Sequence, residues 1–389
     1  MSQHVIQHFN KLIQEEDYSQ LSRKLLDVSV ENNLPSEIET LIYDFRKDYL
    51  NAESKNDLKS KANVLLDLVT NQVDFKEKQW SNELVCNAVN ISKRYVNGGN
   101  PFYLQPLNVE LKYGEITGIV GENGNGKTTL LRILAGELSS DTGTIEYPAL
   151  NASDKNWYKV KNQFVFIPQR IPRWHGSLVD NLRFFASIHG FTEEDNHKQI
   201  NYILFRLGLD KFKHLKWSEL SSGYRLRFEL AKAIMWRPKL ILLDEPLANL
   251  DINAQQLFLQ DLKFFSKSTE FPLSIILSSQ QLHEVESISD NIIFIKQGKT
   301  IYNGNQQAFG INSDLNTFEL ISSANAELLH TIFKEYKVVV ENAGSTFIIS
   351  VGKEISNEVF LSTLISNKIS VNYFRDISNS TRKLFHKDT

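Results

Sequence analysis

The sequence has very little cysteine and no long run of apolar residues. Cys86 is the one cysteine in 389 residues, which excludes an intramolecular disulfide and a metal site built from several thiolates. No stretch approaches the roughly 18 to 20 consecutive apolar residues that a membrane-spanning helix needs. The first residues also lack the basic-then-apolar order of a secretory signal. These absences favour an intracellular chain without a membrane segment of its own.

The sequence also lacks an excess of charge of one sign. Lysine and arginine together number 43 and aspartate and glutamate 46, so the net charge is -3 and we expect no nucleic-acid partner. Apolar residues make up 41% and charged residues 23%, which are ordinary values for folded proteins and argue against a largely disordered chain. A chain of this length is expected to hold about two or three domains.

The first 80 residues are predicted to form a bundle of three or four amphipathic helices, because apolar residues recur there at helical spacing. Ser36, with Glu39 three residues later, resembles a capping box that opens a new helix. We interpret the apolar stripes as the bundle's core in preference to a partner-binding groove. The stripes are Val5, Phe9, Leu12 and Ile13; Leu21, Leu25 and Val28; Ile38, Ile42 and Phe45; and Leu58, Ala62, Leu65, Leu66 and Val69.

Residues 83–308 alternate short apolar strands with helical stretches, which predicts an α/β domain with a largely parallel sheet. Cys86 falls in the first strand, where a small buried apolar role is favoured over a reactive thiol. Residues 309–389 are predicted to form a ferredoxin-like α+β domain, because strands and helices follow in the order βαββαβ. Its strands are expected at 317–322, 337–341, 346–351 and 369–374, and its helices at 324–336 and 357–365.

A phosphate-binding loop is the strongest motif in the chain. Residues 121–128 match G-x-x-x-x-G-K-[ST], follow an apolar run at 116–120 and lead into a predicted helix. Lys127 would contact the β- and γ-phosphates, and the Thr128 hydroxyl would bind Mg²⁺. A surface turn rich in glycine and asparagine would not explain the lysine, the threonine and both flanks. The predicted nucleotide-binding residues are Gly121, Glu122, Asn123, Gly124, Asn125, Gly126, Lys127, Thr128 and Thr129.

A second element supplies carboxylates for the same chemistry. The apolar residues 240–243 are predicted to form a buried strand that ends at Asp244 and Glu245. Asp244 would hold Mg²⁺, and Glu245 would orient and polarise the attacking water as a general base. An acidic strand end is a weak signal by itself, but it is a strong one downstream of a complete phosphate loop. Nucleotide binding is therefore expected.

The remaining motifs resemble those of ABC ATPases. Residues 220–224, Leu-Ser-Ser-Gly-Tyr, resemble the family's signature, and residues 244–251 resemble its Walker B and D-loop. Gln169 stands where the family's Q-loop glutamine falls. Tyr95 is similar to the aromatic residue that stacks on adenine, a role for which Phe102 and Tyr103 compete. The resemblance covers roughly residues 83–308 and implies a P-loop NTPase fold with a helical subdomain at about 170–222.

The resemblance implies ATP and Mg²⁺ as ligands, ATP hydrolysis, and dimerisation around ATP as a homodimer or heterodimer. In such ATPases each nucleotide is held by the phosphate loop of one protomer and the signature of the other. Ser221, Ser222 and Gly223 would thus approach the partner's ATP, while Gln169 would lie beside the metal. The predicted catalytic residues are Glu245, Gln169 and Gln280.

The sequence departs from the family at three positions. Ser222 replaces the usual second-position glycine, which would put a side chain near the phosphate, and Tyr224 replaces a glutamine. Gln280 stands where the family usually has a histidine, and its amide can donate a hydrogen bond but cannot carry a positive charge. His283 is interpreted as a surface helix residue in preference to a displaced switch histidine. Since Glu245 is present, slow but real hydrolysis is expected.

The resemblance further implies a separate membrane permease, with this chain peripheral on the cytoplasmic face. The segment after Gln169 is rich in aromatic residues, most of which are expected in the subdomain's core, while Trp174 and His175 are candidates for exposed permease contacts. The C-terminal region resembles the tail of exporter ATPases of the drug and polysaccharide type. Two alternatives remain: a soluble, non-transport ABC ATPase, and a regulatory nucleotide-binding module that barely hydrolyses ATP.

Overall fold

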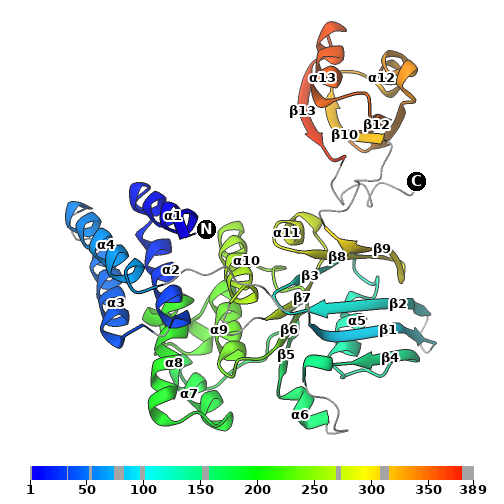
Figure 1. The fold of residues 1–389 in the computed structure, drawn as a ribbon. Helices are drawn as coiled ribbons and strands as arrows, with labels where there is room; N and C mark the ends of the chain where they lie inside the picture. The colour runs from blue at the N-terminus through cyan, green and yellow to red at the C-terminus, as the bar shows by residue number, and fades with distance from the viewer. Residues whose placement is uncertain are drawn as a thin grey trace. The chain divides into compact units, whose positions relative to one another are not determined.

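Figure 1 shows the fold of the computed structural model. The chain divides into two compact units, which are described one at a time. The structure describes residues 2–32, 34–51, 55–73, 83–96, 101–150, 157–268, 273–306 and 315–378. The first unit comprises Met1–Val89, Asn108–Glu115 and Thr144–Ile276, and the second comprises Asn90–Leu107, Ile116–Gly143 and Leu277–Thr389. These units cut across the region 83–308, and the division into domains at 1–80, 83–308 and 309–389 stays a prediction.

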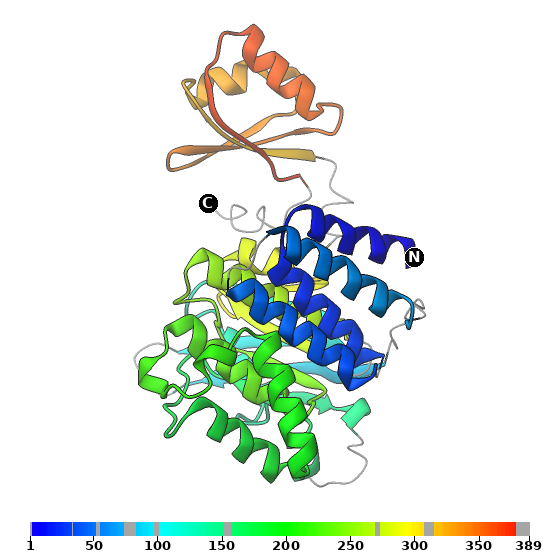
Figure 2. The same ribbon diagram turned by 90° about the vertical axis from the view of Figure 1, so that its left-hand side faces the viewer.

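Four helices open the first unit, as the apolar stripes predicted (Figure 2). They are α1 (Ser2–Gln14), α2 (Tyr18–Glu31), α3 (Ser36–Leu50) and α4 (Lys55–Thr70). The capping box predicted at Ser36 and Glu39 is wrong. Pro35 is the N-cap of α3 and no side chain caps this helix. Because the fixed φ of Pro35 leads directly into the helix, Ser36 is already its first helical residue and cannot cap it.

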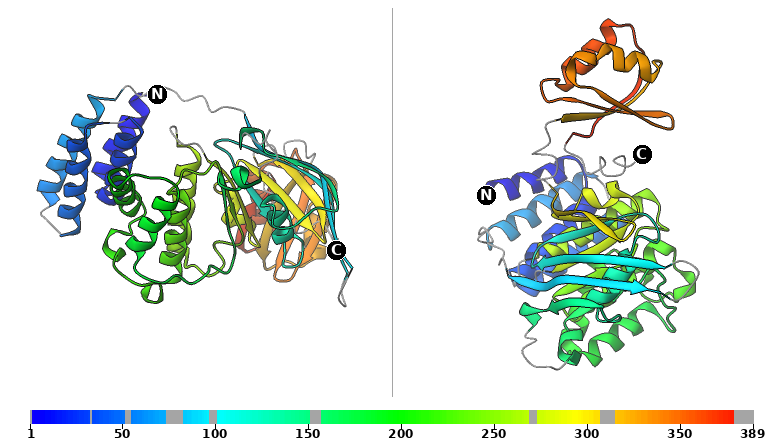
Figure 3. Two further views of the ribbon diagram at one scale, coloured as in Figure 1. Left: turned by 90° about the horizontal axis from the view of Figure 1, so that it is seen from below. Right: turned by 90° about the vertical axis from the view of Figure 1, so that its right-hand side faces the viewer.

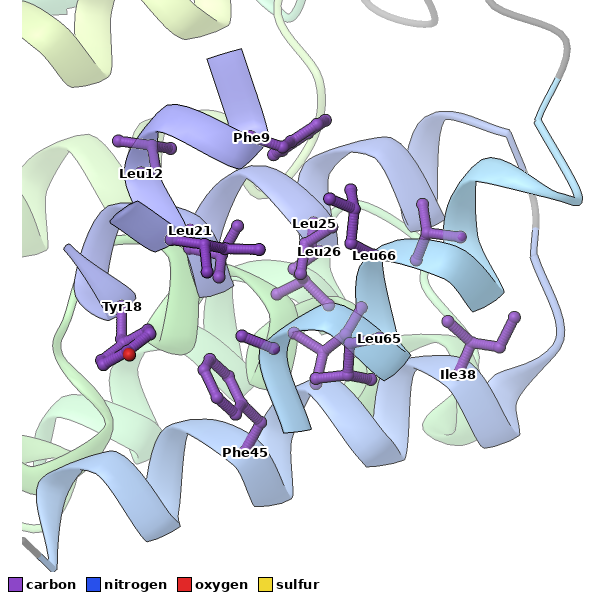
Figure 4. Packing of buried hydrophobic residues seen from close by; sticks show 14 of the residues in the cluster. Phe9, Leu12, Tyr18, Leu21, Leu25, Leu26, Ile38, Phe45, Leu65 and Leu66 are labelled. Carbon is purple, nitrogen blue, oxygen red and sulfur yellow. The ribbon is translucent and has the colours of Figure 1, made fainter. Parts of the chain in front are cut away.

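The core of these four helices is shown in Figure 4. Leu21, Leu25 and Leu26 of α2 have no exposed surface, and Phe45 of α3 is 2% exposed. Phe205, from a helix much later in the chain, belongs to the same cluster of buried side chains. The N-terminal helices therefore share their core with another segment of the first unit.

The rest of the first unit alternates helices with short strands. Its strands β5 (Phe164–Ile167) and β6 (Leu240–Leu243) run parallel, and all four residues of β6 are buried. Three strands, β1 (Leu84–Tyr95), β2 (Phe102–Lys112) and β7 (Ser274–Ser279), begin in one unit and end in the other. The main helices are α6 (Trp157–Lys161), α7 (Leu178–Ile188), α8 (Glu193–Arg206), α9 (Ser222–Ile234) and α10 (Ile252–Ser266).

Cys86 lies on β1 with no exposed surface, as predicted. Burial raises the pKa of its thiol to about 12, so the reactive thiolate does not form near neutral pH. Within the described ranges, no helix is long and apolar enough to cross a membrane.

The second unit contains a parallel pair of strands extended by a hairpin. β3 (Ile116–Val120) is buried along its whole length and pairs in parallel with β8 (Asn291–Lys296). β8 pairs in turn with the antiparallel β9 (Lys299–Asn305). The other elements of this part are α5 (Lys127–Leu134), β4 (Thr142–Glu146), which ends in the first unit, and α11 (Leu282–Glu286).

The second unit ends in a four-stranded antiparallel sheet with the strand order β11-β12-β10-β13 and two helices on one face (Figure 3). With the strands numbered within the domain, this is the 4-1-3-2 order of the predicted ferredoxin-like fold. The first helix is shorter than predicted, since it gives way to a 3-10 turn at Lys334–Tyr336. The elements are β10 (Leu315–Ser322), α12 (Ala326–Ile332), β11 (Val339–Ala343), β12 (Thr346–Gly352), α13 (Asn357–Ser366) and β13 (Val371–Asp376).

Candidate functional site

The predicted phosphate loop connects β3 to α5 in the second unit. Lys127 is the first residue of α5, and its buried ammonium group donates to the carbonyl oxygens of Gly121 (2.7 Å) and Glu122 (3.1 Å). The space where a Cβ of Gly124 would stand is open, and Thr128 is exposed in the first turn of the helix. The loop thus combines backbone N–H groups, an ammonium group and a hydroxyl group, which are the donors that bind phosphates.

Neighbouring residues of the second unit hold this loop in shape. Asn125 is buried, and its side-chain oxygen accepts a hydrogen bond of 2.9 Å from the backbone N–H of Gln297, in the turn between β8 and β9. Gly126 has a φ of 101°, and a Cβ on it would lie 2.8 Å from Cζ of Phe102. Glycine is therefore needed at 126 both for the backbone conformation and for the neighbouring ring.

Two aromatic side chains lie beside the phosphate loop. Phe102 contacts the position of Gly126, and the ring centroid of Tyr95 is 6.4 Å from that of Phe102. Tyr95 is 38% exposed, which leaves ring surface for stacking. The third candidate, Tyr103, packs against the guanidinium group of Arg94 at 4.8 Å. The structure thus places Phe102 at the loop and Tyr95 next to Phe102.

In the first unit, two adjacent strand ends bring predicted catalytic residues together. Ile167 of β5 lies opposite Leu243 of β6, and the N–H of Asp244 donates to the Ile167 carbonyl at 3.0 Å. Gln169 and Glu245, which follow these strands, line one cavity of about 220 Å³. Glu245 is buried and has a φ of 45°, a left-handed backbone conformation that is uncommon outside glycine and typical of functional sites.

The signature residues also lie in the first unit, at the start of α9. Ser221 is the N-cap, and its hydroxyl accepts from the N–H of Tyr224 at 3.4 Å. The Ser222 hydroxyl donates to the carbonyl of Asn249 at 3.0 Å, and Ser222 lines the same cavity as Gln169 and Glu245. A Cβ on Gly223 would lie 3.2 Å from that of Ala254, which keeps the signature close to α10.

Comparison with known proteins gives these motifs a family. Residues 104–248 match the profile of the family described as ABC transporter. An uncharacterised ABC transporter ATP-binding protein of Methanocaldococcus jannaschii is 33% identical over 206 residues, which cover 53% of this chain and 73% of that protein. The chain belongs to the ABC transporter family. Its nucleotide-binding region is therefore an ABC-type ATPase.

Two further matches agree with an ABC ATPase. A molybdate/tungstate import ATP-binding protein of Pyrococcus horikoshii is 30% identical over 216 residues, 55% of this chain and 60% of that protein. The solved structure of cbiO1 from Clostridium perfringens, part of the ABC transporter complex cbiONQ, has a TM-score of 0.52 and 26% identity. That match covers 57% of this chain and 89% of cbiO1.

The departures of this ABC ATPase from its family have structural counterparts. The Ser222 hydroxyl donates to the backbone carbonyl of Asn249 in the D-loop motif, and its place near a phosphate stays a prediction. The ring of Tyr224 packs against Phe212, with 4.1 Å between centroids. Gln280 is exposed at the end of β7, and His283 is exposed on α11, as predicted for a surface helix residue.

One predicted contact residue of the ABC ATPase needs correction. Trp174 is only partly exposed, because its indole N–H donates to Glu229 at 2.5 Å and its ring lies 3.8 Å from the Lys232 ammonium. Burial raises the pKa of Glu229 and lowers that of Lys232, so it disfavours the charged form of both side chains. The indole of Trp174 favours the charged forms, because it donates a hydrogen bond to Glu229 and its ring lies beside the ammonium group of Lys232. The exposed apolar side chains nearby are instead Phe184 (60%) and Ile188 (58%) on α7. His175 is exposed as predicted.

The magnesium site stays a prediction, with Thr128 in the second unit and Asp244 and Gln169 in the first. Within the part of the chain that the structure describes, no group of three or more His, Cys, Asp or Glu side chains could hold a metal ion. Mg²⁺ needs few protein ligands when substrate phosphates supply others. The predicted donors are a hydroxyl of Thr128, a carboxylate of Asp244 and an amide oxygen of Gln169, which suit that case.

Two contributors to the site were missed from the sequence. Asn249 lies within the D-loop motif, but its carbonyl gains a role only because Ser222 reaches it. Gln297 supports the phosphate loop through Asn125, and the Gln297-Gly298 turn after an apolar strand was the available signal.

Proposed function

We propose that the chain is the ATP-binding and ATP-hydrolysing subunit of a transporter and drives a separate membrane permease. The observation that carries the proposal is the cavity in the first unit that Gln169 and Glu245 both line. A water-orienting carboxylate and a Q-loop amide in one cavity suit phosphoryl transfer to water. A phosphate-binding turn without hydrolytic activity would not need the Glu245 carboxylate and the Gln169 amide together.

Each residue has a proposed role in hydrolysis. The N–H groups of residues 121–129 and the Lys127 ammonium bind the phosphates, and Tyr95 stacks on adenine with Phe102 beneath it. Glu245 accepts a proton from the attacking water, while Gln169 and Gln280 orient the reacting groups by hydrogen bonds. Mg²⁺, held by Thr128, Asp244 and Gln169, would neutralise charge on the phosphate oxygens.

The exposed signature supports a dimer. Ser221 and Ser222 are exposed at the start of α9, where N–H groups and the helix dipole favour an anion. The chain has one set of motifs, so the signature would serve the ATP bound to a second copy or to a related ABC ATPase. ATP would then hold the two subunits together, and hydrolysis would release them.

The permease is proposed to dock near α7, which places the chain at the cytoplasmic face of a membrane. Phe184 and Ile188 are exposed on one helix, and exposed aromatic and aliphatic side chains are typical of docking surfaces. The importer relative suggests uptake as strongly as the C-terminal tail suggests export, so the proposal leaves direction open. Recovery of the chain with membranes only when its permease is co-expressed would support this part.

The hydrolysis proposal is tested by a steady-state ATPase assay of the wild type and Glu245→Gln. A general base contributes roughly 100- to 10,000-fold, so we expect a loss of at least about 100-fold with ATP binding retained. His283→Ala is the control, because His283 is exposed and outside the proposed machinery. Equal rates for wild type and Glu245→Gln would instead identify a regulatory module that barely hydrolyses ATP.

A further inference from the structure

A series of buried charged side chains links the N-terminal helix α2 to α8, α9 and α10 of the first unit, which are called the cassette helices below. Asp27 of α2 is 3% exposed, and its carboxylate accepts from Nε of Arg206 on α8 at 2.9 Å. Nη1 of Arg206 donates to Asp261 on α10 at 2.8 Å. The other oxygen of Asp261 accepts from Nη2 of Arg227 on α9 at 3.0 Å. Four helices are thus joined through one continuous series of charge-assisted hydrogen bonds.

The two cassette helices at the end of this series both begin at proposed functional segments. Arg227 lies just over one turn after Ser222, where α9 starts at the signature. Asp261 lies on α10, which is capped by Asp251, the last residue of the D-loop motif. Ser222 is itself bonded to Asn249 of the D-loop. The Asp261–Arg227 pair therefore joins the two helices that carry these motifs.

A second set of contacts connects α3 to the end of α8, next to Arg206. Nη1 of Arg46 donates to the carbonyl of Phe205 at 3.1 Å, and its guanidinium group lies 4.3 Å from the centroid of the Phe205 ring. Arg23 of α2, Arg46 and Arg227 also surround Gly208, at 3.3, 3.5 and 3.8 Å from where its Cβ would stand. Gly208 has a φ of 64°, so glycine suits both this backbone conformation and the crowding around it.

Stability alone does not explain this arrangement. The apolar cluster that includes Phe205 already attaches the N-terminal helices, and buried ion pairs often add nothing over well-packed apolar residues. What a buried ionic series supplies is one defined geometry, because every misplaced partner leaves a desolvated charge. Here the defined geometry is that of α8, α9 and α10 relative to α2.

We propose that helices α1–α4 are a positioning domain for ATP hydrolysis, in which Asp27 holds Arg206 and, through Asp261 and Arg227, sets the placement of the signature and the D-loop. Asp27 is a positioning residue and does not touch the nucleotide. The inference rests on the proposed function, since it requires that the signature act on ATP.

The test compares full-length wild type, Asp27→Asn, Asp27→Glu and Asp48→Asn in steady-state ATPase assays. Asp48→Asn is the matched control, because Asp48 forms an ion pair of 2.6 Å with Lys61 within the same helices but outside the series. Coupling between sites is typically worth roughly 5- to 150-fold, so we expect Asp27→Asn to lower kcat by a factor in that range. The KM for ATP and ATP binding by the single subunit should stay near wild type. Asp27→Glu should restore part of kcat, and Asp48→Asn should match the wild type.

A second readout is dimer formation with ATP in the Glu245→Gln background, which Asp27→Asn should weaken. A wild-type kcat for Asp27→Asn, while Glu245→Gln abolishes hydrolysis, overturns the inference and leaves the proposed function standing. Equal rates for wild type and Glu245→Gln would instead remove the proposed function.

If Asp27→Asn does not fold, Tyr202→Phe serves in its place. The Tyr202 hydroxyl donates to Asp27 at 3.4 Å, and its removal keeps the charges intact. A smaller loss of kcat at constant KM supports the inference, and an unchanged kcat overturns it.

Discussion

The N-terminal helices α1–α4 and the C-terminal segment β10–β13 differ in which parts of the chain supply their cores. The core of α1–α4 includes Phe205 of α8, and their Asp27 is bonded to Arg206 of the same helix. Among the residues that the structure describes, all members of the C-terminal core lie between Phe318 and Phe374. We therefore expect the C-terminal segment to be the more independent of the two.

The two cores also differ in how they are built. Phe360 of α13 packs against Phe318 and Phe333, with ring centroids 4.4 and 4.6 Å apart, so the C-terminal domain closes on its own aromatic residues. Helix α2 instead contributes Leu21 and Leu25 to the core of the N-terminal helices, and its Asp27 is bonded to Arg206 of α8. We expect the C-terminal domain to unfold by itself and the N-terminal helices to unfold together with the ATPase region.

The largest expected effect is that of Phe360→Ala, which removes a fully buried ring. Such substitutions cost about 3–5 kcal/mol, and the loss should appear only in the transition of the C-terminal domain. Calorimetry should show that transition at a lower temperature, with the ATPase rate unchanged. An equal shift of every transition would mean that the domain is not independent.

Leu25→Ala should have a slightly smaller effect but a wider reach. Leu25 has no exposed surface, and its truncation costs about 2–5 kcal/mol. Because its core includes Phe205, heating should inactivate the ATPase at a lower temperature than in the wild type. Leu41→Ala is the control, since Leu41 is 46% exposed and such changes usually stay within about 0.5 kcal/mol. Loss of helical signal without earlier inactivation would contradict the shared core.

The third prediction concerns the pH dependence of stability. Burial raises the pKa of Asp27 from 3.8 to about 7, although Arg206 beside it favours the carboxylate. An acid with a higher pKa in the folded state stabilises most below its unfolded pKa, and that contribution is lost as pH rises through the folded value. The free energy of unfolding of the wild type should therefore fall more steeply between about pH 4 and pH 7 than that of Asp27→Asn. Denaturation at several pH values measures this difference, and identical slopes would contradict it.

Much of the fold could be predicted from the sequence, because it is encoded locally. The apolar spacing gave the helices that contain Leu25 and Phe45, and the alternation of strands and helices gave the ferredoxin-like order. The phosphate loop was equally clear, since its glycines, Lys127 and Thr128 stand next to one another. These signals depend on neighbours in the chain, which a sequence shows directly.

The rest depends on partners far apart in the chain. Periodicity shows that a helix has an apolar face, but it does not show that Phe205 joins the core beneath it. Asp27 and Arg206 are 179 positions apart, and neither has a local pattern that marks it as buried. Trp174 was misjudged for the same reason, because its partners Glu229 and Lys232 lie on a later helix.

The crowding around Gly208 has a consequence for the ancestry of such proteins. A protein without α1–α4 would expose the Phe205 ring to solvent, and Arg206 would lack the carboxylate of Asp27. A gene that gained the segment would add two guanidinium groups, those of Arg23 and Arg46, around Gly208, where that of Arg227 already lies. An exchange of the N-terminal segment alone would therefore leave residues 205–208 without the partners that this segment supplies.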